Sequence, residues 1–194
     1  YLAAISGMLL THLCMSGSSL GLVGERENGT YEQMLSLPTS SLEIVLGKLV
    51  PMVGICYVVL ALAMVIAGAV FGFWPRGSFL VLCVVALPFV LASLAIGVLV
   101  STLAHTSAQA VFITVFFIMP SFVLSGIMLP YALMPHPIRE IGGLLPLRWF
   151  QIASRQLAAR GGGFVDVLEP IAVLVLMFAV LLGLARWRMK PRLG

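Results

Sequence analysis

The chain has 194 residues, of which 61% are hydrophobic and only 9% are charged, with a formal net charge of +4. Soluble domains carry roughly 25% charged residues, so the composition excludes an ordinary soluble fold and indicates a mostly helical integral membrane protein. The positive charges are few and scattered, which argues against a nucleic-acid-binding surface.

Five apolar stretches are long enough to cross a bilayer, because a spanning helix needs roughly 20 residues. We predict membrane helices at residues 1–23, 41–73, 78–103, 107–129 and 167–186. Pro88 and Pro120 lie inside two of them and predict bent helices packed in a bundle. The chain starts at Tyr1 within an apolar run, so we expect a fragment with a segment missing upstream. The predicted fold class is an all-α membrane bundle of about five helices.

The orientation is predicted from the basic residues that directly follow the last apolar stretch. These are Arg186, Arg188, Lys190 and Arg192. Because basic residues concentrate on the cytoplasmic side, we expect a cytoplasmic C-terminus. Counting back places residues 24–40 and 103–107 on the cytoplasmic side and residues 74–77 outside.

A polar island at residues 24–48 separates the first two apolar stretches, whereas no Asp, Glu, Lys or Arg occurs between Arg76 and Arg139. Thr30 with Gln33 fits a helix capping box, and a second capping box at Ser40 and Glu43 opens the next membrane helix. Pro38 limits the first of these helices to about two turns. Gly29 is expected to adopt a positive φ at the turn before it.

The short helix after Gly29 has an apolar face formed by Tyr31, Met34 and Leu35. One interpretation is an interfacial helix that lies on lipid. The other is a docking element for a groove in a cytoplasmic protein. These residues alone leave both interpretations open.

A second amphipathic segment occupies residues 147–160. Its apolar face has Trp149, Phe150, Ala153 and Leu157, and its polar face has Arg148, Gln151 and Arg155. Aromatic residues in such a position are typical of a membrane interface.

Several packing features are predicted within the apolar stretches. The pairs Gly17/Gly21 and Gly68/Gly72 have the spacing of close helix contacts, although such pairs are also common by chance. Cys14, Cys56 and Cys83 are interpreted as small buried hydrophobic residues. His12 lies mid-helix, where an ionisable group is a functional candidate, but a neutral histidine bonded across the bundle is favoured.

Catalytic chemistry is not indicated. Gly47-Lys48 lacks the first glycine of a phosphate-binding loop, which is replaced by Leu42, so ATP hydrolysis would need a separate chain. The three histidines, which include His105 and His136, are too dispersed for a metal site. The predicted spans lack the buried carboxylate typical of proton- or sodium-coupled carriers and the nucleophile or acid pair of an intramembrane enzyme.

The polar island closely resembles the ERE-x-GT-x-EQL…P…EI…GK pattern of type-2 ATP-binding-cassette (ABC) transporter permeases, through residues 25–35, Pro38, 42–44 and 47–48. Residues 124–126, Pro130 and Met134-Pro135 resemble the LSG-x-x-x-P…MP pattern of the same family. Residues 145–150 resemble its (L/I)P-L-x-(Y/W)-F segment. The bacterial drug- and lipid-export branch is the most similar, and a departure such as Asn28 is mild.

The resemblance implies that residues 1–194 form a type-2 transmembrane domain that lacks the first of six helices and the following extracytoplasmic region. Residues 31–37 would be the coupling helix, with short re-entrant helices at the outer face before the last span. The implied ATPase-coupling residues are Glu25, Arg26, Glu27, Gly29, Thr30, Tyr31, Glu32, Gln33, Met34 and Leu35. The implied outer-face residues are Ser125, Gly126, Pro130, Pro135, Pro146, Trp149 and Phe150.

The function that the resemblance implies is that of a permease subunit in a bacterial inner-membrane exporter for hydrophobic or amphipathic compounds. Its partners would be an ABC ATPase subunit and a second permease copy, identical or different. ATP and Mg would bind to the ATPase and not to this chain, which would itself not be an enzyme. An ATP-independent channel or secondary carrier is the alternative.

Overall fold

The computed structural model describes residues 2–29, 41–72, 79–126, 134–160 and 164–188. Within these ranges every regular element is a helix, which confirms the predicted all-α class. The elements are α1 (Leu2–Glu27), α3 (Ser41–Phe71), α4 (Phe79–Leu103), α5 (Ser107–Leu124), α6 (His136–Gly143), α7 (Pro146–Arg160), the 3-10 helix η2 (Phe164–Val167) and α8 (Leu168–Arg188). Five of them, α1, α3, α4, α5 and α8, are long and apolar enough to cross a membrane.

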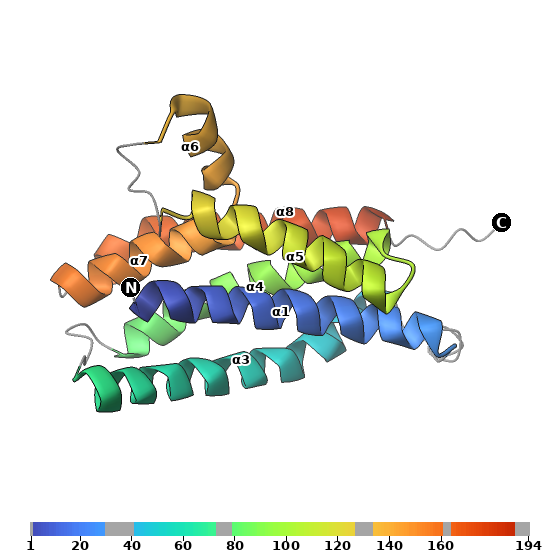
Figure 1. Cartoon of the computed structure of the whole chain (residues 1–194), viewed down its shortest axis with the longest axis horizontal. Coiled ribbons are helices and arrows are strands. Elements are labelled where there is room, and N and C mark those ends of the chain that lie inside the picture. The colour runs from blue at the N-terminus through green and yellow to red at the C-terminus, as the bar shows by residue number, and fades with distance from the viewer. Residues whose placement is uncertain (1, 30–40, 73–78, 127–133, 161–163, 189–194) are drawn as a thin grey trace.

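The five long helices lie side by side and alternate in direction (Figure 1). The end of α1, the turn between α4 and α5, and the end of α8 all lie at the right-hand end of the bundle in Figure 1. The relative arrangement therefore agrees with the predicted topology. We name this the α1-exit end of the bundle. Whether it faces the cytoplasm stays a prediction.

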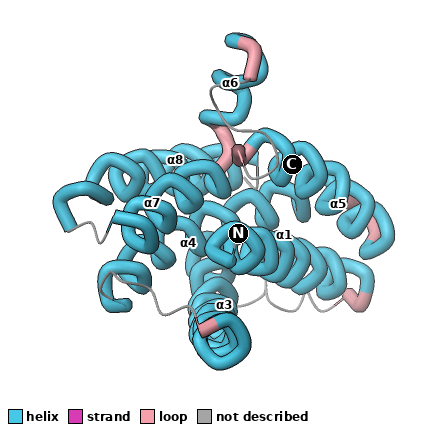
Figure 2. Tube along the Cα trace, turned by 60° about the vertical axis from the view of Figure 1, so that its left-hand side comes forward, coloured by secondary structure: helices cyan, strands magenta, loops and turns pink. Residues whose placement is uncertain are grey.

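Helix α4 forms the centre of the bundle. In its most apolar stretch 72% of the residues are buried, against 17% in α3 and in α8. It packs against α1, α3, α5, α7 and α8, and Figure 2 shows it enclosed by the other helices. Its sequence suits this place, because small residues such as Ala92, Ser93 and Ala95 are fully buried and let neighbouring backbones approach.

One close contact to a neighbouring helix backbone involves a glycine that the spacing pattern did not single out. A Cβ atom at Gly97 of α4 would lie 1.9 Å from Ser18 Oγ and 2.7 Å from the carbonyl oxygen of Met15 in α1. Of the predicted glycine pairs, Gly17 does contact α3, since its Cβ would lie 1.7 Å from Met52 Cε, whereas Gly21 has open space. A glycine contact thus depends on which face of the helix meets a neighbour, and spacing alone does not reveal that.

Two helix boundaries differ from the prediction. Helix α1 continues to Glu27, about one turn beyond the predicted end at residue 23, and so carries three charged residues. Helix α5 ends at Leu124 and not at residue 129. The reason lies at Gly126, whose φ of +84° is a left-handed conformation that commonly ends helices. Pro88 and Pro120 lie inside α4 and α5 as predicted, and Pro51 lies inside α3.

Helix α7 is embedded more deeply than its amphipathic pattern predicts. It packs against α1, α4 and α8, and the ring of Phe150 stacks on Phe89 of α4 at a centroid distance of 4.3 Å. Gln151 is 2% exposed and Ser154 is equally buried. Gln151, which the pattern places on the polar face, is therefore buried as well, because α7 packs against more than one neighbouring helix.

Candidate functional site

Three consecutive charged residues at the end of α1 each contact a different helix. Glu25 forms a salt bridge with Lys48 of α3. Arg26 Nη1 donates a hydrogen bond of 3.0 Å to the carbonyl oxygen of Ser101 in α4. Glu27 accepts a hydrogen bond of 2.9 Å from the backbone N–H of Ser107 in α5 and a second one from its hydroxyl. We call Glu25, Arg26 and Glu27 with these partners the three-way clamp.

Helix geometry explains how three neighbouring residues reach three helices. Consecutive residues on an α-helix point about 100° apart, so the triplet projects in three directions. Helices α3, α4 and α5 all pack against α1 or end beside it, and each direction meets one of them. The clamp therefore arises from placing a charged triplet on a helix that is surrounded on three sides.

Each charged side chain in the clamp contacts a partner of opposite charge or opposite partial charge. Lys48 offers a positive charge to Glu25. Ser101 lies in the last turn of α4, where carbonyl groups give the helix end a partial negative charge that suits Arg26. Ser107 is the first residue of α5, where free N–H groups favour an anion such as the Glu27 carboxylate. Each contact is thus electrostatically favourable in this order of charges.

The start of α5 is organised by its own cap. The hydroxyl of Thr106 accepts a hydrogen bond from the backbone N–H of Gln109 at 3.3 Å, and the Gln109 side chain accepts one from the backbone N–H of His105 at 2.9 Å. The pattern T-x-x-Q is a capping signal. The sequence contains this signal, and it would have indicated where α5 begins and therefore where the backbone N–H groups that bind Glu27 lie.

Some of the predicted coupling residues lie within the described part of the chain, and the others do not. The structure places Glu25, Arg26 and Glu27 in the clamp, and Gly29 has the predicted positive φ, at +72°. The other predicted coupling residues lie outside the described residues; they are Thr30, Tyr31, Glu32, Gln33, Met34 and Leu35. The sequence interpretation missed the partners Ser101 and Ser107, for which the polar island held no signal.

The predicted outer-face residues lie near the opposite end of the bundle, where α5, α6 and α7 meet. Ser125 caps α5 and is buried, and the carbonyl oxygen of Gly126 accepts a hydrogen bond of 3.0 Å from Arg155 Nη2 of α7. The indole N–H of Trp149 donates to the carbonyl oxygen of Gly143 at 2.9 Å. These contacts tie the segments together and offer no reactive group.

The remaining predicted outer-face residues lie at helix starts or outside the described residues. Pro135 precedes α6, and Pro146 is the first residue of α7. Pro130 lies outside the described residues. Helix α6 stands out from the side of the bundle in both views (Figures 1 and 2), so only α7 of the two short helices is packed within it.

His12 has no hydrogen bond to another helix among the described residues, so the expectation of a bond across the bundle is wrong. It is exposed, and its nearest described polar partner is Ser16 Oγ on the same helix, 3.4 Å from Nδ1. It faces a groove of about 290 Å³ between α1 and α5. The groove is lined by Ile5, Met8, Leu9, His12, Val115, Ile118 and Met119.

The cysteines agree with the interpretation as apolar packing residues, with one addition. Cys14 and Cys56 are buried, and their sulfur atoms lie 3.2 Å apart between α1 and α3. Cys83 is half-buried. Among the described residues no group of three His, Cys, Asp or Glu side chains is placed to hold a metal ion.

Five apolar spans, four of them around the central helix α4, with a charged clamp at one end, define a multi-pass helical membrane protein. Residues 1–187 match the family model described as "ABC-2 family transporter protein". The chain therefore belongs to the ABC-2 transporter family.

The relatives include bacterial permeases. The chain is 30% identical over 179 residues to the "Probable multidrug ABC transporter permease YbhS" of Escherichia coli K12, which covers 91% of this chain and 47% of the relative. It is 26% identical over 194 residues to the "Inner membrane transport permease YhhJ" of the same strain, covering 100% and 51%. It is 23% identical over 178 residues to the "Linearmycin resistance permease protein LnrN" of Bacillus subtilis, covering 92% and 46%. The chain spans about half the length of these relatives.

Proposed function

We propose that this chain is the membrane-spanning part of an ABC exporter permease in a bacterial inner membrane, with the α1-exit end in the cytoplasm. It moves hydrophobic or amphipathic compounds outward, driven by ATP hydrolysis on a separate ATPase subunit, and works together with a second permease copy. Family membership and the similarity to bacterial permeases support this proposal.

The observation that carries the proposal is the three-way clamp. Glu25, Arg26 and Glu27 lie shortly before residues 31–37, the segment that the family resemblance assigns to the coupling helix. Each of them binds a different helix. A displacement of that segment by a bound ATPase would pull on α1 and, through the clamp, on α3, α4 and α5 together.

Two roles can then be separated among the predicted coupling residues. Tyr31, Met34 and Leu35 would supply the apolar contact with the ATPase. Glu25, Arg26 and Glu27 would act as positioning residues that pass the displacement to the bundle. Their side chains are engaged within this chain, which is why we assign them to transmission and not to ATPase contact.

The groove between α1 and α5 is suited to an apolar cargo. Its walls are aliphatic or thioether side chains apart from His12, which is the ionisable group at this depth in α1. Hydrophobic lining with a single polar group is typical of sites for apolar molecules. We assign cargo contact to this groove.

The test measures complex formation and transport separately. The permease is co-purified in mild detergent with its candidate ATPase, and export of a fluorescent drug is followed in inverted vesicles. Met34→Asp should abolish the complex, whereas Glu27→Gln should keep the complex and lose most of the transport. Glu169→Gln, at an exposed position near the other end of the bundle, is the matched control and should change neither.

The alternative is an ATP-independent channel or carrier. It predicts transport without any ATPase, and no complex with one. If drug export by the purified permease proceeds without ATP, or if Met34→Asp leaves both complex and transport intact, the coupling assignment is wrong.

A further inference from the structure

Two thiols meet between α1 and α3 in the apolar interior of the bundle. Cys14 and Cys56 are 0% and 1% exposed, and their sulfur atoms lie 3.2 Å apart although the two residues are 42 positions apart in the sequence. Each lies about ten residues inside its membrane span, Ile5–Glu27 or Leu46–Val70. At roughly 1.5 Å per residue, both lie near the middle of a hydrocarbon core of roughly 30 Å. We call Cys14 and Cys56 the thiol pair.

The geometry of the thiol pair suits a disulfide. The role of a small hydrophobic residue explains why each cysteine is buried, but it does not require the two sulfur atoms to touch. A disulfide bond is roughly 2.05 Å long, so the sulfur atoms need to approach by only about 1 Å. Cys83 is half-buried in α4, and no described contact joins its thiol to another cysteine. The same molecule therefore contains a paired and an unpaired thiol within its membrane spans.

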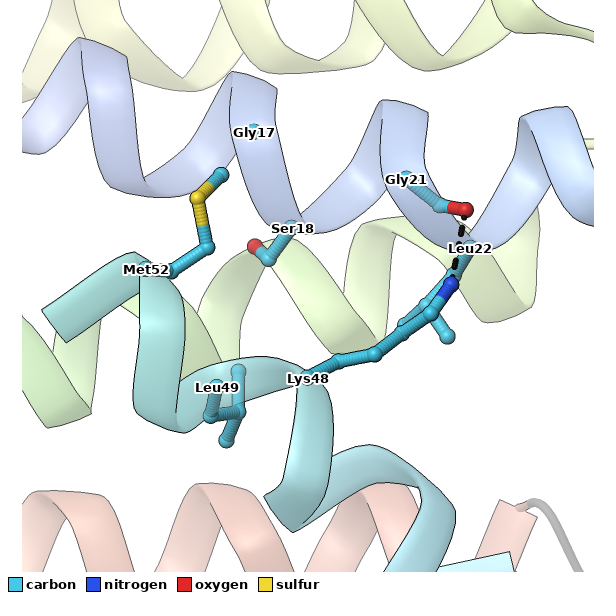
Figure 3. Close-up of a pocket in the computed structure, with 7 residues that line it drawn as sticks. All are labelled: Gly17, Ser18, Gly21, Leu22, Lys48, Leu49 and Met52. Carbon is cyan, nitrogen blue, oxygen red and sulfur yellow. Dashed lines mark hydrogen bonds between the residues drawn. The ribbon is translucent and has the colours of Figure 1, made fainter. Parts of the chain in front are cut away.

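The packing of α3 against α1 is open on both sides of the thiol pair. Helix α3 lies at the edge of the bundle (Figures 1 and 2), with 17% of its most apolar stretch buried. Toward the clamp, a groove of about 200 Å³ has Gly17 and Met52 in its walls (Figure 3). Toward the other end, a groove of about 230 Å³ has Leu9 and Val59 in its walls. A small displacement of α3 therefore suffices to let a molecule from the bilayer reach the two sulfur atoms.

The surroundings of the thiol pair select an apolar oxidant. The walls of both grooves are mainly aliphatic, thioether or glycine residues. The side chains of Ile55 and Val58, which neighbour Cys56 on α3, are exposed on the outside of the bundle, where the bilayer lies. Transfer of a charged, water-soluble oxidant such as oxidised glutathione to this depth is costly. An organic hydroperoxide, the class of compound that forms on acyl chains, is soluble there.

We propose that the thiol pair is an oxidation site, at which a membrane-soluble organic hydroperoxide forms a disulfide that fixes α3 to α1. One sulfur attacks the terminal peroxide oxygen, so an S–O bond forms, the O–O bond breaks, and the thiol proton leaves with the alcohol. The second sulfur attacks the resulting sulfenic acid, so the S–S bond forms, the S–O bond breaks, and water leaves with the second thiol proton. The two thiols lose two electrons to the hydroperoxide, which becomes alcohol and water. An isolated buried thiol is inert, but a second sulfur in contact captures the sulfenic acid as a disulfide.

The disulfide adds a second level of attachment between α1 and α3. Lys48 of α3 already contacts Glu25 and the carbonyl oxygen of Gly21 at the clamp end of α1. Cys14 lies 11 residues before Glu25, which is roughly 16 Å along the helix. The bond also closes a loop of the chain and so restricts the unfolded state, which stabilises the folded one. The inference rests on the thiol pair and does not depend on the proposed transport function.

The test compares two oxidants on the wild-type permease in nanodiscs, after reduction with dithiothreitol. One sample receives cumene hydroperoxide and the other receives oxidised glutathione, and peptide mass spectrometry measures the state of each cysteine. Cumene hydroperoxide should produce the Cys14–Cys56 link at least about tenfold faster than oxidised glutathione does, because access limits the charged reagent. Dithiothreitol should reverse the link. The linked protein should unfold at a temperature about 4 °C or more above that of the reduced protein.

Two serine variants separate the thiol pair from the third cysteine. Cys56→Ser leaves Cys14 without a second sulfur, so the hydroperoxide should produce neither the link nor the rise in unfolding temperature. Cys83→Ser is the matched control and should form the link as the wild type does.

Three results on the wild-type protein would each overturn the proposal. The first is that oxidised glutathione links the thiol pair as fast as the hydroperoxide does. The second is that the hydroperoxide oxidises Cys83 in preference to the pair, or converts the pair to sulfinic acids without a link. The third is that the linked and reduced proteins unfold at the same temperature.

Discussion

Glu27 and Ser107 lie 80 positions apart in the sequence, yet two hydrogen bonds join the end of α1 to the start of α5. One comes from the Ser107 backbone N–H at 2.9 Å and the other from its hydroxyl. The carboxylate thus sits at the positive end of the α5 dipole. Because the predicted coupling helix at residues 31–37 follows α1 in the sequence, this contact joins the end of α1 nearest to that segment to the start of α5.

We expect Glu27→Gln to reduce drug export strongly, because the amide lacks the charge that the α5 terminus favours. Ser107→Ala should have a smaller effect, since the backbone N–H still donates. The double variant should be no worse than Glu27→Gln alone, because residues that share one interaction are not additive. The measurement is ATP-driven export in vesicles, and strictly additive losses would show that the two residues act separately.

Gly97→Ala should destabilise the bundle by about 1–3 kcal/mol, because the added Cβ collides with Ser18 Oγ and with the Met15 backbone. The measurement is thermal unfolding in detergent. Gly54→Ala is the control and should be neutral or slightly stabilising, since alanine favours helix more than glycine does and Gly54 has open space. A Gly97→Ala protein as stable as this control would mean that α1 and α4 do not approach so closely.

Phe150→Ala should remove the ring that stacks on Phe89 and leave a cavity between α4 and α7. Truncation of a fully buried phenylalanine costs about 3–5 kcal/mol. Thermal unfolding again measures the effect. Phe112→Ala, at a side chain that is 76% exposed, changes the same chemical groups without a cavity. If both variants unfold at the same temperature, α7 is not part of the packed core.

The sulfur atoms of Cys14 and Cys56 are close enough, at 3.2 Å, for a mild thiol oxidant to join α1 and α3. With copper phenanthroline as the oxidant, peptide mass spectrometry should find the Cys14–Cys56 link. Cys83 lies on α4, with Tyr57 bound to its carbonyl oxygen, and no described contact joins its thiol to another cysteine. A dominant link to Cys83 would contradict the placement of α3 against α1.

Membrane orientation can be measured with single cysteines in a cysteine-free background. His105 and Asp166 are exposed near opposite ends of the bundle. We expect a membrane-impermeant maleimide to label Asp166→Cys in intact cells and His105→Cys only after the membrane is opened. The reverse pattern would show that the α1-exit end faces outward and would remove the basis for ATPase coupling there.

Much of the fold could be predicted because each membrane span can be recognised from its own stretch of sequence. A span needs only length and apolar composition, and the five predicted stretches correspond to α1, α3, α4, α5 and α8. A helix end was harder to predict where charged residues continue the helix, as at residues 25–27. Charged residues normally indicate that the chain has left the bilayer. The structure retains this turn since Lys48, Ser101 and Ser107 compensate its charges.

The depth of α7 could not be predicted from its pattern. An amphipathic sequence fits both a helix on the membrane surface and one enclosed by helices with a few polar neighbours. Gln151 and Ser154 are buried in a helix that packs against α1, α4 and α8. The exposure of His12 could not be predicted either, because it depends on the groove between α1 and α5.

The sequence by itself determined the helical class, the number of spans, the positive φ at Gly29 and the family, because composition, periodicity and local motifs carry that information along the chain. Only the tertiary structure decided which helix lies at the centre, that Gly97 makes the close contact, and that three adjacent charges bind three different helices. These properties depend on which faces of distant segments meet. No local pattern encodes that, because lipid and protein neighbours both favour apolar side chains.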